Sequence, residues 1–138
     1  DTGATITITP KLATSKIVVF ARCAATLQKN DDAVMGGVKL VRNVGGGSFS
    51  NLVIPMADTT GPYEQQLEHT AGGNISGVTM NMNYSFLDDP DTTSACIYKL
   101  QARVYSSGSS HQWYFGNSGG GGGAQTQEMI AMEILSDS

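Results

Sequence analysis

Residues 78–87 read Val-Thr-Met-Asn-Met-Asn-Tyr-Ser-Phe-Leu, and this stretch decides the fold. Apolar and neutral polar side chains alternate through it with a period of two. Because successive side chains of a β-strand point to opposite faces, five apolar groups share one face. They are Val78, Met80, Met82, Tyr84 and Phe86. Burying that face contributes on the order of 10 kcal/mol before conformational entropy is subtracted, so we expect a strand that lines a core.

Similar strand signals recur along the chain, separated by clusters of Gly, Asn, Asp and Ser. They cover residues 5–9, 16–26, 34–44, 51–56, 63–69, 95–105, 111–115 and 128–135. One face of 16–26 carries Ile17, Val19, Ala21, Cys23 and Ala25, and the inward face of 95–105 carries Cys96, Tyr98, Leu100, Ala102 and Val104. Ile130, Met132 and Ile134 share a face of the last strand. We therefore predict an all-β fold, an antiparallel β-sandwich or jelly roll of about eight or nine strands.

The composition fits one domain over 1–138, since 138 residues and 14.5 kDa match a single core. Only 14% of the residues are charged, against roughly 25% in an average soluble domain. The chain has no run of about 18 apolar residues, which argues against membrane insertion. It has no Lys/Arg cluster, which argues against a nucleic-acid partner. It starts at Asp1 with no signal-peptide pattern, so it is compatible with the C-terminal part of a longer protein.

The two cysteines, Cys23 and Cys96, have no metal-ligand spacing and are too few for a disulfide framework. Both fall on the apolar face of an expected strand. Two alternatives stay open: two small buried hydrophobic groups, or one bridge that closes a long loop.

Several segments resemble the C-terminal domains of phage tail-fibre-like proteins, especially those of phages of cyanobacteria and marine bacteria. The most specific are Tyr84–Ala95 and Tyr98–Arg103; weaker ones are Thr14–Val19, Val38–Asn43 and Met132–Ile134. The resemblance covers about Thr5 to Leu135. It implies a jelly roll that assembles as a homotrimer with other virion proteins at the virion surface, on a tail fibre or on the capsid exterior. It carries over no catalytic residue.

An aromatic segment near the C-terminus is the candidate ligand site. Flat aromatic faces beside neutral hydrogen-bonding groups suit the apolar faces and hydroxyls of sugar rings. The candidate contacts to a host cell-surface polysaccharide are Tyr105, Gln112, Trp113, Tyr114 and Asn117. In a second interpretation Trp113 and Phe115 fill the core while Tyr114 faces outward, and in a third the segment is a subunit contact.

Reactive machinery is not expected, and neither is a cofactor. The only histidines, His69 and His111, have no nucleophile context, so we expect no enzyme. The glycine runs 45–47 and 119–123 lack the lysine and helix start of a phosphate loop, and we interpret both as flexible connections.

Three carboxylates, those of Asp88, Asp89 and Asp91, follow the deciding stretch. With Pro90 among them, they are typical of a turn. A calcium site is the alternative, because calcium prefers several carboxylate oxygens, but the spacing lacks the glycine and distant glutamate of an EF-hand.

The polar face of the deciding stretch is neutral, with Thr79, Asn81, Asn83 and Ser85. Neutral groups cost less to desolvate than charged ones, so this face suits a neighbouring subunit. The favoured function is a trimeric virion head domain whose rim loops 106–110 and 118–126 contact glycans. The alternatives are a capsid decoration or cement protein with a purely structural role, and a trimeric ligand module of cytokine or complement type.

Overall fold

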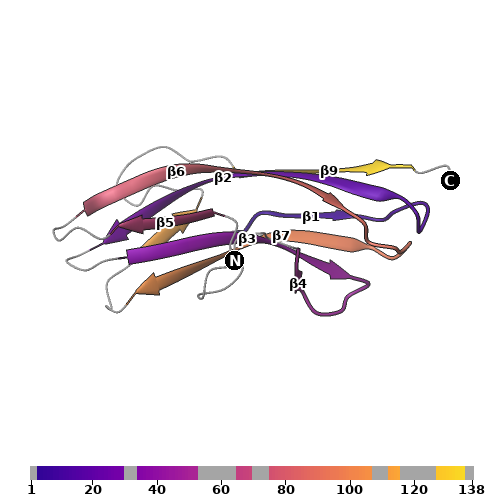
Figure 1. Cartoon of the computed structure of the whole chain (residues 1–138), viewed down its shortest axis with the longest axis horizontal. Coiled ribbons are helices and arrows are strands. Elements are labelled where there is room, and N and C mark those ends of the chain that lie inside the picture. The colour runs from indigo at the N-terminus through magenta and orange to yellow at the C-terminus, as the bar shows by residue number, and fades with distance from the viewer. Residues whose placement is uncertain are drawn as a thin grey trace.

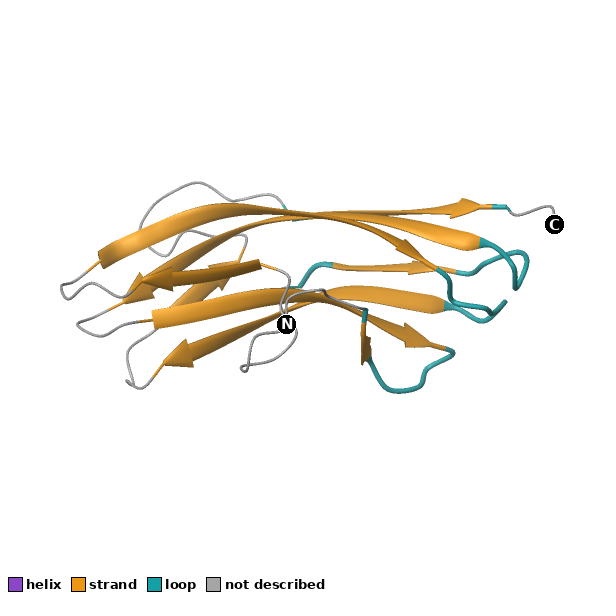
Figure 2. Cartoon of the chain, in the orientation of Figure 1, coloured by secondary structure: helices purple, strands orange, loops and turns teal. Residues whose placement is uncertain are grey.

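The computed structural model of the chain describes residues 3–29, 34–52, 65–69, 75–106, 112–115 and 127–135. Within them lie nine strands and no helix (Figure 2). The strands are β1 (Thr5–Ile8), β2 (Lys16–Lys29), β3 (Val34–Val44), β4 (Ser50–Asn51), β5 (Gln65–His69), β6 (Ile75–Asp88), β7 (Cys96–Ser106), β8 (Gln112–Phe115) and β9 (Glu128–Ile134). The all-β prediction is confirmed for this part of the chain.

The strands form two antiparallel sheets that lie as two layers (Figure 1). The five-stranded sheet has the order β1-β7-β3-β4, with β5 also paired to β3. The four-stranded sheet has the order β6-β2-β8, with β9 also paired to β2. The chain changes sheet between β1 and β2, β2 and β3, β5 and β6, β6 and β7, and β7 and β8. The architecture is therefore that of a β-sandwich.

The deciding stretch forms most of β6 and pairs with β2 along nearly its whole length. Cys23 lies opposite Met82, and Ala21 lies opposite Tyr84. Residues that are directly opposite in an antiparallel pair share a face, so the apolar sides of the two strands coincide. Met82 is 0% exposed and Tyr84 is 3% exposed. The predicted alternation is confirmed from Asn81 to Phe86; Asn81, Asn83 and Ser85 are exposed.

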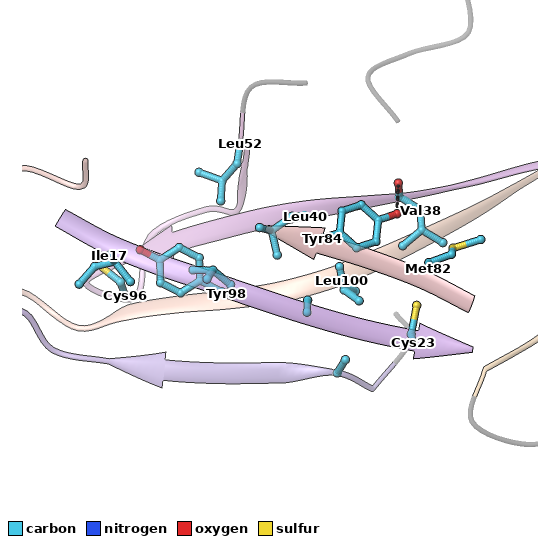
Figure 3. Close-up of a cluster of buried hydrophobic side chains, with 13 residues drawn as sticks. Ile17, Cys23, Val38, Leu40, Leu52, Met82, Tyr84, Cys96, Tyr98 and Leu100 are labelled. Atoms are coloured by element: carbon cyan, nitrogen blue, oxygen red, sulfur yellow. Dashed lines mark hydrogen bonds between the residues drawn. The ribbon is translucent and has the colours of Figure 1, made fainter. Parts of the chain in front are cut away.

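The core is built from the facing sides of both sheets (Figure 3). Its members include Ile17, Val19, Cys23, Met82 and Tyr84 from the four-stranded sheet, and Val38, Leu40, Cys96, Tyr98 and Leu100 from the five-stranded sheet. The Tyr84 hydroxyl donates a 3.0 Å hydrogen bond to the carbonyl oxygen of Val38. This bond satisfies the one polar atom of Tyr84 inside the core and joins β6 to β3.

Both cysteines are free thiols buried in this core. Cys23 belongs to β2 and Cys96 to β7, so they lie on different sheets. The interpretation as two small buried hydrophobic groups is confirmed. Burial raises the pKa of the Cys23 thiol to about 11. It also raises the pKa of the Cys96 thiol.

Two turns lie at the ends of long strands, and the one that follows β6 was predicted from the sequence. β6 ends at Asp88 and β7 begins at Cys96, and between them Asp91 has φ +46°, a left-handed conformation that Asp tolerates better than most residues. After β3, Gly45 has φ +58° and Gly46 has φ +81°. The Asn43 side chain accepts a 3.1 Å hydrogen bond from the Gly46 amide and donates to the Gly47 carbonyl. The first glycine run is therefore a hydrogen-bonded turn in which Gly45 and Gly46 have the positive φ that favours glycine. The flexibility of this connection stays a prediction.

Candidate functional site

The aromatic segment predicted to contact glycans forms β8, an outer strand beside β2. Its backbone runs antiparallel to residues 25–28, with Trp113 opposite Leu27 and Tyr114 opposite Thr26. β8 therefore extends the four-stranded sheet beyond the end of β9, which pairs with residues 16–22 of the same strand. The side chains of β8 lie outside what the structure describes.

Of the other two candidate glycan contacts, Tyr105 and Asn117, the structure places only the backbone of Tyr105. The backbone of Tyr105 belongs to β7 in the five-stranded sheet, opposite Met35. It is therefore on a different layer of the sandwich from Gln112, Trp113 and Tyr114. Asn117 and the side chain of Tyr105 lie outside the described residues. The glycan site stays a prediction.

The best-defined polar cluster lies at the turn that follows β6, where the two sheets meet. Arg42 Nη1 on β3 lies 2.6 Å from Asp88 Oδ1 and 2.7 Å from Asp88 Oδ2. The Tyr98 hydroxyl on β7 donates a 2.6 Å hydrogen bond to Asp88 Oδ2. Asp88 ends β6, so the three side chains tie the four-stranded sheet to the five-stranded one. The sequence alone gives no sign of this pairing, because Arg42 and Asp88 are 46 residues apart.

The electrostatics of this cluster agree with its geometry. Burial raises the pKa of the Tyr98 hydroxyl, and the hydrogen bond and negative charge of Asp88 raise it further. Burial alone would lower the pKa of Arg42, but its hydrogen bond to Asp88 and the attraction of that carboxylate outweigh burial and raise it. Tyr98 therefore stays a neutral donor and Arg42 a cation, so the cluster holds one complete charge pair in a nearly buried position.

This arrangement fits a structural lock better than a reactive or ion-binding site. Both Asp88 oxygens already accept hydrogen bonds. Asp89 forms a 2.9 Å ion pair with Lys16 on the surface. Within the described residues, no three His, Cys, Asp or Glu side chains gather as ligands for a metal ion. The carboxylates of Asp88 and Asp89 therefore connect strand ends.

A different feature dominates the surface: the outer side of the four-stranded sheet exposes large apolar groups. Phe20 on β2 is 43% exposed and Leu87 on β6 is 56% exposed. On β9, Ile130 is 54%, Met132 48% and Ile134 49% exposed. We call these five residues, with the half-buried Val18 between them, the outer apolar face.

The strand β9 is central to this face, because three of its large apolar side chains point away from the core. Ile130, Met132 and Ile134 share one face, as the period of two predicts. That face points away from the core, whereas Met129 and Ala131 pack against the core. The neutral residues Asn81, Asn83 and Ser85, predicted to suit a subunit contact, are exposed on the same outer side of the sheet.

One end of the outer apolar face is hollowed. Phe20, Arg22, Asn83, Glu128 and Ile130 line a shallow pocket over three neighbouring strands. Arg22 and Glu128 lie opposite each other in the β2–β9 register, and both are exposed. The pocket therefore combines an apolar floor with one positive and one negative group, which suits a protein contact of mixed character.

Comparison with known proteins gives no match to any protein-family model and none to a curated protein sequence. In the part of the chain that is described, no helix has the length and apolar character to cross a membrane.

The outer apolar face is the functional feature that sequence analysis missed. The signal was present in residues 16–22, where Ile17, Val18, Val19 and Phe20 are apolar without alternation. A strand that is apolar on both sides is typical of one covered on both faces. Here the second face is open in the single chain, so the same pattern indicates a surface that another molecule covers.

Proposed function

We propose that this chain is a structural protein of a bacteriophage particle, a jelly-roll head domain of tail-fibre type. In this proposal it assembles as a homotrimer at the virion surface and recognises host surface glycans. The observation that carries the proposal is the outer side of the four-stranded sheet. There, exposed apolar residues such as Phe20 and Met132 adjoin the neutral residues Asn81, Asn83 and Ser85. Such a surface is costly to leave in water and cheap to bury against another subunit.

Two further features support the proposal. The chain passes back and forth between the sheets of the sandwich, as strands of a jelly roll do. The block with the most specific resemblance to phage tail-fibre domains, 84–103, forms the end of β6, the turn and most of β7, and it contains Asp88 and Tyr98 of the polar cluster. In this proposal that block acts through packing.

The second candidate function is a decoration or cement protein that clamps capsid subunits. The outer apolar face favours it as well, because a permanent contact with shell proteins would bury such a face. The position of the chain on the particle separates the two functions. Antibody labelling and a symmetry-resolved image of purified particles should place it at the tail for the first function and on the shell for the second. Its absence from purified particles would overturn both.

Host recognition needs its own test, through the β8 segment. Trp113→Ala and Tyr114→Ala should each reduce host adsorption and glycan-array binding while circular dichroism stays unchanged, since stacking on sugar rings would be lost. Thr7→Ala, an exposed position of β1 in the other sheet, is the matched control and should bind normally. Three linked copies would make weak sugar sites effective through avidity, so assays should use the assembled protein. Unchanged adsorption by the folded β8 variants would remove the glycan role.

A further inference from the structure

We infer that the outer apolar face is the surface through which copies of this chain associate, with Arg22 of one copy paired to Glu128 of the next. This inference rests on the self-association in the proposed function. It adds the face that is used, the direction of the symmetry axis and a specific pair of charges across the interface.

The outer apolar face offers enough apolar area for a contact between two copies. Five large side chains are each between 43% and 56% exposed on this face. At roughly 200 Å² for a large side chain, they offer on the order of 500 Å² of apolar surface. A standard interface buries about 800 Å² on each partner, and a homodimer interface is about 65% apolar, so each copy must offer about 500 Å² of apolar surface. One face therefore carries the apolar area that a stable contact between two copies needs.

The residues of the outer apolar face lie in rows across the strands. The register of β2 with its two neighbours sets which residues lie side by side. From one end to the other, the rows are Asn83–Arg22–Glu128, Ser85–Phe20–Ile130 and Leu87–Val18–Met132, followed by Lys16–Ile134. Beyond the first row, Ala24 and Thr26 are buried, so the open part of β2 ends near Arg22.

The rows of the outer apolar face favour one direction of the rotation axis that relates the copies. A rotation axis parallel to the strands keeps every row at its own height, whether it relates two copies or three. Apolar rows then meet apolar rows, and Phe20 of one copy meets Ile130 of the next. An axis perpendicular to the strands reverses the rows instead. It lays the row of Arg22 and Glu128 in one copy over the row of Lys16 and Ile134 in its neighbour, so that the exposed Ile134 meets a charged row. The row pattern therefore favours the parallel axis.

Two opposite charges lie at one end of the outer apolar face. Arg22 on β2 and Glu128 on β9 occupy one row, are both exposed, and carry opposite signs. Around an axis parallel to the strands, Arg22 of each copy faces Glu128 of a neighbour at the rim of the apolar rows. Each interface therefore gains an opposite-charge pair, with Arg22 supplied by one copy and Glu128 by the next.

The apolar part is tested by analytical ultracentrifugation of Met132→Glu, with Thr7→Glu as control. Both positions are exposed strand positions, but Thr7 belongs to β1 in the other sheet. The dissociation constant should rise roughly 100-fold for Met132→Glu, because a charge is buried without a partner, and stay unchanged for Thr7→Glu. Thermal unfolding monitored by circular dichroism checks that both variants fold.

The charge pair is tested by mixing two variants. Arg22→Glu and Glu128→Arg alone should each associate roughly 100-fold more weakly, because like charges then face each other. When the two variants are mixed, the introduced glutamate of one copy meets the introduced arginine of the other in two of the three interfaces of a mixed trimer, so association should return in large part. A pair confined to one chain cannot be restored by mixing, so the mixture separates contact between copies from contact within a copy.

The outcomes distinguish this inference from the proposal beneath it. If the wild-type chain stays monomeric up to its solubility limit, both the homotrimer and this interface are wrong. If it associates but Met132→Glu associates equally well, this face is not the interface while the homotrimer stands. If Met132→Glu is monomeric but mixing restores nothing, the Arg22–Glu128 pair and the axis direction are wrong.

Discussion

Arg42 and Asp88 form an ion pair across the sandwich, with one guanidinium nitrogen 2.6 and 2.7 Å from the two carboxylate oxygens. The Arg42 side chain is 20% exposed and that of Asp88 is 6% exposed. The pair joins the end of β6 to β3, on the other sheet, and Tyr98 completes it with a third hydrogen bond. Because the nearly buried Asp88 carboxylate bonds to Arg42 and Tyr98 on the other sheet, sliding the two sheets past each other would break these bonds and lower the stability of the fold.

Removing one partner of this pair should be far more costly than removing an exposed charge. Arg42→Met keeps most of the apolar stem but leaves the Asp88 carboxylate without its counter-ion, which should lower the free energy of unfolding by about 3–5 kcal/mol. Lys16→Met is the matched control, because the Lys16–Asp89 pair has side chains 45% and 60% exposed; it should cost less than about 1 kcal/mol. Urea unfolding measures both. Equal losses would contradict the structural role of the buried pair.

The period-two assignment of β6 has a direct test. Met82→Lys places an ammonium where the side chain is 0% exposed, and it should destabilise the fold by more than about 3 kcal/mol. Thr7→Lys, at an exposed position of β1 in the other sheet, should change stability by less than about 0.5 kcal/mol. Denaturant midpoints compare the two. A loss under about 1 kcal/mol for Met82→Lys would place the strand one residue out of register.

The two core tyrosines should respond differently to the loss of a hydroxyl. Tyr84 donates to the neutral carbonyl of Val38, whereas Tyr98 donates to the carboxylate of Asp88. Tyr84→Phe should cost about 1 kcal/mol, and Tyr98→Phe about 1.5–3 kcal/mol, because hydrogen bonds to charged groups are stronger. Each variant keeps the ring, so packing is held constant while unfolding is measured. A larger loss of stability for Tyr84→Phe than for Tyr98→Phe would mean that the hydrogen bond of Tyr84 to Val38 is the stronger one, contrary to this prediction.

Much of the fold could be predicted because the strands carry their burial in a local pattern. Alternation in β6 and β7 names Met82, Tyr84, Tyr98 and Leu100 as inward residues, and all four are buried. The direction of β9 could not be predicted in this way. Its odd positions include Met129 and Ala131, and its even positions include Ile130, so both faces are apolar and the period does not choose between them.

The candidate site was harder to predict, because its contacts are remote in sequence. Arg42 lies in a strand where an outward cation is ordinary, and only the meeting of β3 with the end of β6 brings it to Asp88. The outer apolar face likewise arises from β2, β6 and β9, which the register assembles into rows. Side-chain pattern gives the faces of single strands, while the order of strands in a sheet is a tertiary property.

The buried thiol of Cys23 gives the stability a dependence on alkaline pH. Burial raises its pKa from 9.0 in the unfolded chain to about 11 in the folded protein. The folded state therefore holds its proton over a range where the unfolded state loses it. The stabilisation is complete below about pH 9 and is lost as pH rises toward about 11, so the free energy of unfolding falls through that window.

Comparison with Cys23→Ala isolates this contribution, since burial also raises the pKa values of Cys96 and Tyr98. Between pH 9 and pH 11, the wild-type chain should lose about 2 kcal/mol more than Cys23→Ala. The cavity left by the alanine lowers the free energy of unfolding by the same amount at every pH. It therefore does not contribute to the difference between the two proteins in how that free energy changes with pH. Urea unfolding at fixed ionic strength across this range measures the difference. If the free energies of unfolding of the two proteins changed in parallel with pH, the Cys23 thiol would have the same pKa in the folded and unfolded states. That result would contradict its burial between the sheets.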